Sequence, residues 1–302
     1  MKLVRPIAVT VANLTSDVTQ PESLWLIGAT YSAADDVYEV VDGVPMSFIS
    51  KAGGNIGHQP SADTAATYWE PMGATNRWRM FDGEVQTQTA QADGIEVEVE
   101  LSADEALDTV RLANVSALSV QVVAVDAVDG TVYDETFDMT SNVGIDDYLP
   151  WFTEPIIRKT GLTLSDLPSL YPGVTVTVTL EAPGEDAACG LCLFGLSRYI
   201  GGTKWDSELG FRDLSVKDED PFGGLFIVER SFKRTASFDI TVHSGFVDEL
   251  QRLLEAYRAT PVLFIGDDEY DTMAIYGFVK AFKTQVKLRN HSICSLDLES
   301  LA

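Results

Sequence analysis

The chain has 302 residues and carries 46 acidic against 21 basic side chains, which gives a formal net charge of −25. This length predicts two or three domains, and a hydrophobic content of 45% is enough to bury their cores. Phosphate backbones and anionic membrane surfaces repel a chain this acidic, so we expect neither sequence-specific nucleic-acid binding nor membrane binding.

The N-terminal residues lack the continuous apolar stretch of a secretory signal, because Pro6, Asn13 and Ser16 interrupt it. The sequence also has no run of about 20 apolar residues that would span a bilayer. We therefore expect a protein that is made in the cytosol without classical secretion.

Aromatic residues are concentrated in the first eighty positions, and the segment from Tyr68 to Gly83 alone holds two tryptophans, a tyrosine and a phenylalanine. Large aromatics build the core of a small β module, but flat rings also stack on the apolar faces of sugars. Both interpretations stay open. If a sugar binds, the candidate stacking residues are Trp25, Tyr31, Tyr38 and Trp69.

The residue pattern of the central part of the chain predicts β-strands. From Ile95 to Leu101 apolar and acidic residues alternate strictly, which predicts a half-buried strand with an acidic outer face. Similar strand patterns occupy Leu118 to Val125 and Val174 to Leu180. Turn residues recur every 8 to 12 positions, a spacing typical of a β-sandwich or jelly roll.

The three cysteines are too few for a disulfide framework. Cys189 and Cys192 form a C-x-x-C pair, but no second pair exists to complete a zinc site. They lie in a short apolar run that predicts a buried strand, on which residues three apart face opposite sides. We expect small buried side chains rather than a metal or redox site.

One helix is expected near the C-terminus. Between Ser244 and Pro261 the apolar residues recur at helical spacing, with Ser244 as the expected N-cap and Pro261 as the stop. Two strand-like runs precede this helix and three follow it. Polar segments from Gly83 to Asp93 and from Gly201 to Gly224 suggest boundaries between domains.

The sequence offers little catalytic chemistry. It contains three histidines and no nucleophile-elbow, Walker, dinucleotide-binding or H-E-x-x-H motif. The many carboxylates could supply a glycosidase pair, but a solvated acidic surface explains them better. We expect no catalytic residue, no metal and no cofactor.

The segment from Trp25 to Gly73 resembles the small chitinase-type carbohydrate-binding module. The positions that fall on that family's pattern are Trp25, Gly28, Tyr31, Val37, Phe48, Pro60 and Trp69. Two positions depart from it: Ala34-Asp35 replaces the usual Gly-Asp turn, and Phe48 stands where tyrosine is common. The resemblance implies the module's fold more strongly than its sugar binding.

Nearly the whole chain resembles a tail protein of long-tailed bacteriophages, of the tail-tip or baseplate type. The resemblance rests on the segments RPIAVTVANLTS, GATNRWRMFDG, YPGVTVTVTL, ACGLCLFG and the last fifty residues, in this order. It implies a galactose-binding-like jelly roll after the outer module, entered through NRWRMFDG. Trp78 and Phe81 would then form the interdomain core.

The expected fold is mainly β: an N-terminal arm (1–21), a carbohydrate-module-like domain (22–74), a jelly roll (75–200) and a β-sandwich with one helix (201–302). The resemblance implies a structural, non-enzymatic subunit of a virion, ring-forming as a trimer or hexamer, with the helix residues Phe246, Leu250 and Tyr257 at the oligomer interface. Its partners would be other tail proteins: the tail tube, the hub and the tape measure. The alternatives are an adhesin that binds host-surface glycan and, less favoured, a glycan-degrading enzyme.

Overall fold

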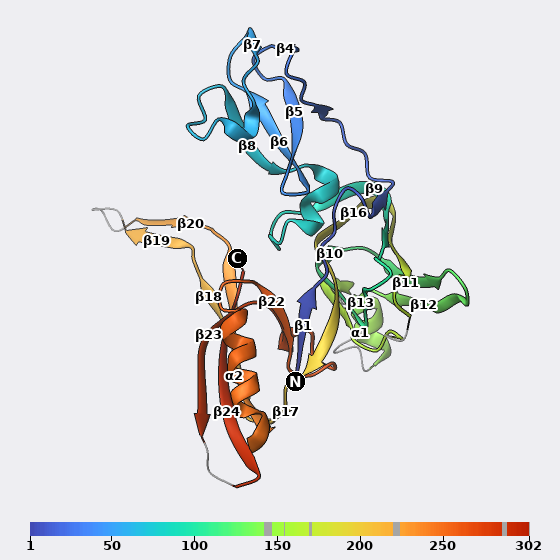
Figure 1. The fold of residues 1–302 in the computed structure, drawn as a ribbon, viewed down its shortest axis with the longest axis vertical. Helices are drawn as coiled ribbons and strands as arrows, with labels where there is room; N and C mark the ends of the chain where they lie inside the picture. Colours follow the sequence, from blue (N-terminus) through green and yellow to red (C-terminus); the bar gives the residue numbers. More distant parts are fainter. Residues whose placement is uncertain (142–146, 154, 169–170, 220–223, 286–288, 302) are drawn as a thin grey trace.

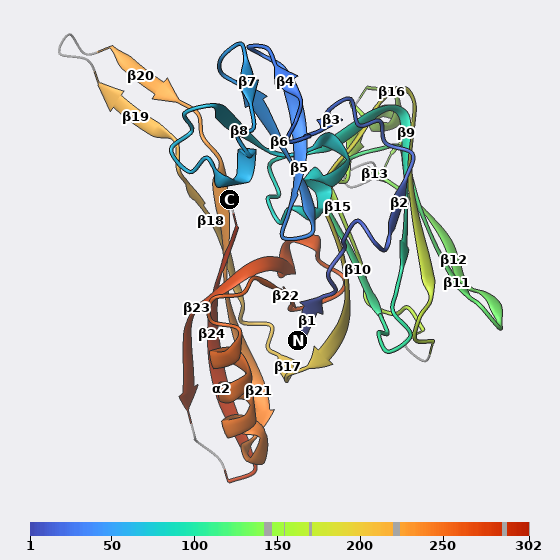
Figure 2. The ribbon, with the colours of Figure 1, turned by 45° about the horizontal axis from the view of Figure 1, so that its top comes forward.

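The computed structural model describes residues 1–141, 147–153, 155–168, 171–219, 224–285 and 289–301. The chain is mainly β, as the sequence predicts. Three modules are visible: a small outer module at the top of Figure 1, a middle β-sandwich, and a C-terminal sheet that carries the long helix. Figure 2 shows the same three bodies after rotation, with a hairpin projecting from the C-terminal module.

The outer module is built on a four-stranded sheet in the order β3-β5-β6-β8. A tight Asp42-Gly43 turn joins β5 and β6, and both residues have positive φ (50° and 86°), as a two-residue hairpin of this type requires. The core is small and consists of Val37, Phe48 and Trp69. The elements are β3 Ser23–Leu24, β4 Thr30–Tyr31, β5 Asp36–Val41, β6 Val44–Ser50, β7 Asn55–Ile56, the 3-10 turn η1 Pro60–Ala62 and β8 Trp69–Ala74.

The middle module is organised around one long strand, β16, which pairs with β9, β10, β11 and β1. Its register with β9 shifts between Ala182 and Asp186. This break separates the β16 segment that pairs with β11 from the segment that pairs with β10. The elements are β2 Leu14–Ser16, η2 Asn76–Phe81, β9 Thr89–Glu100, β10 Thr109–Ser116, β11 Ser119–Asp126, β12 Gly130–Asp138, β13 Thr140–Ser141, α1 Tyr148–Thr153, β14 Ile157–Arg158, β15 Gly161–Leu164 and β16 Thr175–Tyr199.

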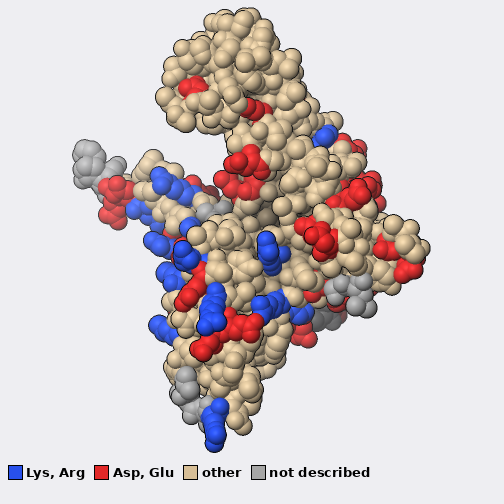
Figure 3. Space-filling view, in the orientation of Figure 1, with Lys and Arg blue, Asp and Glu red and all other residues tan. Residues whose placement is uncertain are grey.

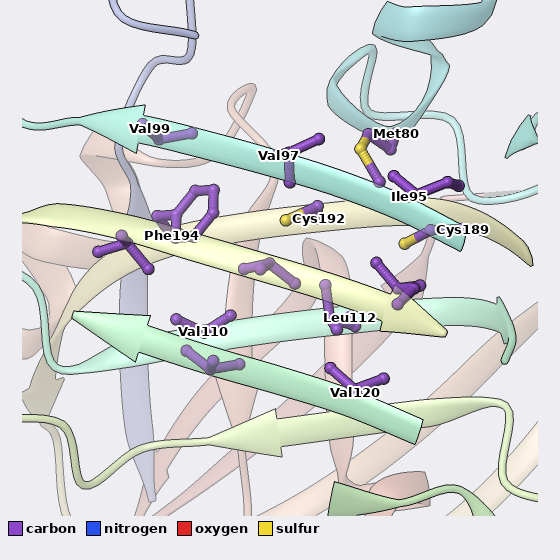
Figure 4. Close-up of a cluster of buried hydrophobic side chains, with 14 of the residues drawn as sticks. Met80, Ile95, Val97, Val99, Val110, Leu112, Val120, Cys189, Cys192 and Phe194 are labelled. Atoms are coloured by element: carbon purple, nitrogen blue, oxygen red, sulfur yellow. The ribbon is translucent and has the colours of Figure 1, made fainter. Parts of the chain in front are cut away.

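The core of the middle module confirms the alternating pattern of β9. Ile95, Val97 and Val99 are buried (Figure 4). The glutamates between them are exposed. Cys189 and Cys192 are buried on β16 as expected, but both pack into this one core rather than on opposite sides of the strand. Burial raises the pKa of the Cys189 thiol to about 12, so the thiol stays protonated and unreactive at neutral pH.

The N-terminal strand β1 (Lys2–Pro6) joins the middle and C-terminal modules. It pairs antiparallel with β16 on one side and with β22 on the other, so a single sheet runs from β12 to β17 through both modules. The buried side chain of Val4 packs in a cluster with Leu193 and Leu263, which come from the two sides. Residues 2–6, at the start of the segment expected to be an N-terminal arm (1–21), therefore form part of this sheet.

The C-terminal module packs α2 on one face of an antiparallel sheet (Figure 1). The helix is preceded by a 3-10 turn, whose N-cap is His243: its Nδ1 accepts a hydrogen bond from Gly245 N (3.2 Å), so the expected cap at Ser244 is corrected by one residue. The elements are β17 Gly202–Thr203, β18 Glu208–Asp213, β19 Val216–Glu219, β20 Leu225–Val228, β21 Phe232–His243, η3 Ser244–Phe246, α2 Val247–Ala256, β22 Val262–Ile265, η4 Asp271–Met273, β23 Ala274–Gln285 and β24 His291–Ser300.

Candidate assembly surface

The four candidate stacking residues of the outer module do not form an exposed row. Trp69 is only 1% exposed, so its assignment as a sugar-stacking residue is corrected: its ring fills the core of the module. Tyr31 meets it edge-on, with ring centroids 5.2 Å apart, and Trp25 packs against the same core. Tyr38 is half-buried on β5.

A different aromatic pair is presented at the surface of this module. The rings of His58 and Tyr68 stack in parallel, with centroids 3.5 Å apart, and Tyr68 is exposed. The sequence gives no signal for this pair, because the two residues are ten positions apart in irregular chain.

Trp78 and Phe81 lie where the outer module enters the middle module. Trp78 is buried, Phe81 packs against the core of the sandwich, and the two rings meet edge-on at 6.0 Å. Met80, between them, is fully buried in the same core. The short η2 turn therefore inserts its apolar side chains into the sandwich.

The helix residues expected at an oligomer interface instead face the core of their own module. Leu250 is fully buried in the core of the C-terminal module, and Phe246 and Tyr257 pack against that core. The apolar face of α2 is therefore satisfied by its own sheet, and Leu250 is not available to a second copy. This corrects the assignment of Leu250, because an amphipathic pattern alone does not distinguish an intramolecular from an intermolecular apolar partner.

The segment from Gly201 to Gly224, which was expected to mark a domain boundary, contains the strands β17, β18 and β19. β18 pairs with β21, and beyond it β19 pairs with β20 to make a hairpin that projects away from the body (Figure 2). Residues 220–223 lie outside the described residues. We call the described residues of this projection, 208–219 and 224–232, the arm.

The arm exposes large apolar side chains. Phe211 on β18 is 72% exposed and Phe226 on β20 is 62% exposed. The further exposed apolar residues of the arm are Leu209, Val216, Leu225, Ile227, Val228 and Phe232. A two-stranded hairpin with both faces exposed to solvent is marginally stable on its own. An exposed apolar patch of this kind is typical of an interaction site.

A hollow of about 680 Å³ lies at the base of the arm. Phe211, Ile227 and Phe232 line it together with charged side chains of both signs, namely Lys217, Arg230, Arg234, Asp213 and Glu229. The hollow therefore combines an apolar wall with mixed charge and does not select a partner of one charge.

Charge is unevenly distributed over the modules. Residues 75–200 hold 6 basic and 21 acidic side chains, whereas residues 201–302 hold 12 and 17. Figure 3 shows most of the visible Lys and Arg over the C-terminal module and the arm, with Asp and Glu among them, whereas Asp and Glu predominate over the middle module. Among the described residues, Arg212 and Arg230 of the arm form no ion pair within the chain.

An ion-pair cluster fixes the C-terminal module to the sandwich. Arg111, only 3% exposed, donates to Asp271 and to Thr163 Oγ1 (2.6 Å), and Arg234 lies 3.7 Å from Asp271. The carboxylate of Asp271 packs over Gly161, where an added Cβ would lie 2.8 Å from Oδ2. The glycine is thus needed for this close approach.

Asp82 lies at the junction of all three modules. It accepts hydrogen bonds from Glu84 N (2.7 Å) and Thr87 Oγ1 (3.1 Å), and Gly83 next to it faces the hydroxyl of Tyr276. Burial raises the pKa of Asp82 to about 6. Burial also raises the pKa of Tyr276, and the negative charge of Asp82 adds to that rise.

In the part of the chain that the structure describes, no three His, Cys, Asp or Glu side chains come together in a way that would hold a metal ion. No helix in those residues has the length and apolar character to cross a bilayer.

Comparisons of the chain with protein-family models, with curated proteins and with solved structures find no match.

Proposed function

We propose that the chain is a structural, non-enzymatic subunit of a phage tail tip or baseplate, of the distal-tail type, which assembles into a ring of three or six copies. The observation that carries the proposal is the arm, a projecting hairpin whose apolar side chains are exposed in the isolated chain. The family resemblance of the sequence supplies the location: a virion assembled in the host cytoplasm, in contact with other tail proteins.

The architecture supports a role as a rigid structural subunit. One sheet passes through the middle and C-terminal modules, and the Arg111–Asp271 contact holds them in fixed orientation. A rigid body with an apolar projection on one side is suited to a heterologous interface, which closes into a ring when the rotation between copies is right.

The experiment measures the mass of the full-length chain in solution by mass photometry across a concentration series. The wild type is expected to form trimers or hexamers, whereas a Phe226→Ser/Ile227→Ser double variant is expected to stay monomeric, because the arm loses apolar contact area. Val128→Ser is the matched control, since Val128 is also an exposed apolar residue but lies in the β11–β12 turn. A double variant that assembles like the wild type would contradict a role of the arm in assembly.

Glycan recognition by the outer module is a second candidate, favoured by the exposed Tyr68 ring supported by His58. A glycan array probed with the full-length chain tests it. Binding that is lost in Tyr68→Ala and kept in Tyr38→Ala would support this role, and no binding to any host-surface glycan would count against it.

A further inference from the structure

A cavity of about 240 Å³ lies where the middle and C-terminal modules meet. β10 of the middle module contributes Arg111 to its wall, whereas β21 and β23 of the C-terminal module contribute Arg234 and Tyr276. The apolar part of the wall also comes from both modules and includes Leu191, Ala274 and Ile275. We call this space the Arg111 cavity.

The hydrogen-bond donors in this wall outnumber their acceptors. Arg111 is only 3% exposed, and within the described residues it donates only through Nη1, to Asp271 and Thr163, which leaves its Nε and Nη2 groups without a partner there. The Arg234 guanidinium lies 3.7 Å from Asp271 and makes no hydrogen bond to any described residue. Since buried donors without partners cost stability, this wall favours a ligand that accepts hydrogen bonds.

The Tyr276 hydroxyl is a further free donor. It has no hydrogen-bond partner in the described part of the chain. Burial raises the pKa of Tyr276, so the hydroxyl keeps its proton at neutral pH and can donate it to a ligand.

We propose that the Arg111 cavity binds a small organic monocarboxylate, with its carboxylate between Arg111 and Arg234 and its apolar body against Leu191 and Ile275. Both guanidinium groups lie against the carboxylate of Asp271, so they are close enough to each other to hold one anion together. Their planar N–H donors match the two oxygens of a carboxylate. This binding site goes beyond the proposed function and does not depend on it.

The size and charge of the cavity narrow the class of ligand. Its volume is below the roughly 300 to 1,000 Å³ of pockets that take drug-sized molecules, so the ligand is smaller than these. The charge nearby is close to balanced, because Arg111 and Arg234 face Asp271 and, beyond Tyr276, the carboxyl of Asp82. The two acidic groups repel a phosphate dianion more strongly than a singly charged carboxylate.

The test measures binding of benzoate to the full-length chain by isothermal titration calorimetry, in a buffer free of carboxylates and phosphate. We expect one benzoate to bind per chain at millimolar concentration or below, and benzamide, which has the same ring without the charge, not to bind. The melting temperature should also rise with benzoate concentration, because a ligand of the folded state stabilises it. Absence of benzoate binding, or equal binding of benzamide, would overturn the inference.

Substitutions in the wall locate the bound carboxylate. Arg234→Gln removes one of the two cationic groups and should weaken benzoate binding about tenfold or more. Lys233→Gln is the matched control, since Lys233 is the neighbouring residue on β21 but pairs with Glu299 and lies outside the described lining of the cavity. Equal benzoate affinity in the wild type and Arg234→Gln would contradict the inference.

A second pair of variants separates the cavity from the hollow at the base of the arm, because the two share Phe232, Arg234 and Ile275. Tyr276 lines only the cavity and Phe211 lines only the hollow. Tyr276→Phe should therefore weaken benzoate binding, whereas Phe211→Ser should leave it unchanged. The reverse pattern would place the ligand in the hollow and overturn the inference, and this comparison still decides the question if Arg234→Gln fails to fold.

Discussion

The pKa of Asp82 depends on the burial of this residue at the junction of the three modules. It is a half-buried carboxyl whose pKa rises from 3.8 to about 6, mainly because of burial. The folded state therefore favours the protonated form. The stabilisation from this preference is fully present below about pH 4 and is lost as the pH rises through about 6.

Replacing Asp82 by asparagine removes this pH dependence and keeps an oxygen acceptor for Glu84 N and Thr87. The shift corresponds to about 3 kcal/mol, which solvent screening of a half-exposed group reduces to about 1 kcal/mol. We expect Asp82→Asn to be more stable than the wild type at pH 8 and equal to it at pH 4, measured by urea denaturation.

Asp126→Asn is the control of opposite sign. Backbone hydrogen bonds from Asp129 and Val128 lower the pKa of Asp126, so its carboxylate stabilises the fold above about pH 4 and this stabilisation is lost as the pH falls. The variant should therefore be less stable than the wild type at pH 8. An Asp82→Asn variant that is destabilised equally at both pH values would refute the account of the junction.

Asp271 is the second residue whose contribution to the unfolding free energy can be tested by substitution. Asp271→Ala leaves the buried guanidinium of Arg111 without its counter-charge, and we expect a loss of about 2 to 3 kcal/mol in unfolding free energy because Asp271 is partly exposed. Asp268→Ala, which breaks the solvated pair with Lys2, should change it by less than about 1 kcal/mol. Similar losses in the two variants, by calorimetry, would argue against a lock between the modules.

Residue types alone could not assign these roles. The sequence identifies Trp25, Tyr31 and Trp69 as important aromatics, but whether a ring faces the core or the solvent depends on the strand that carries it. The Arg111–Asp271 pair joins residues 160 positions apart, so only the fold brings them together.

At the scale of elements, the position of α2 was predicted correctly, but the surface that its apolar face contacts was predicted wrongly. The helical spacing of its apolar residues predicts the helix, and the structure confirms it at Val247–Ala256. The same face buries Leu250 against the module's own sheet. Periodicity gives the apolar face of a helix, but not the surface that covers it.

Leu250→Ala tests this placement. Removal of a fully buried leucine side chain should lower the unfolding free energy by about 2 to 5 kcal/mol, whereas Gln251→Ala on the exposed side should have little effect. The mass of the assembled chain should be unchanged in both variants. A stable Leu250→Ala chain that no longer assembles would instead place Leu250 at an interface.

The sequence predicts part of the arm, because the strand-like run expected from Phe226 to Phe232 overlaps β20, but it does not predict β18, β19 or α1. β18 and β19 lie in the charged segment from Gly201 to Gly224 and have no regular alternation, since both of their faces are exposed. In contrast, β9 alternates strictly because one of its faces is buried, and it was predicted correctly. Strands that are exposed on both faces carry no periodic signal of their own.

For the whole molecule, the continuous sheet implies that the middle and C-terminal modules unfold together. β1 is hydrogen-bonded to strands on both sides, and the cluster around Val4 spans the boundary. The outer module, by contrast, has its own sheet and its own small core. Calorimetry should therefore show one large transition and a separate smaller one, and a third resolved transition would contradict this description.

The central claim is that the chain is a ring-forming subunit at the tip of a phage tail. Electron microscopy of purified virions of the encoding phage, with immunogold label against this chain, tests it most directly. The account predicts label confined to the tail tip, at a multiplicity that fits three or six copies. Virions that carry no label, while the chain is abundant in the infected cell, would contradict it and leave a sugar-binding protein outside the virion as the better explanation.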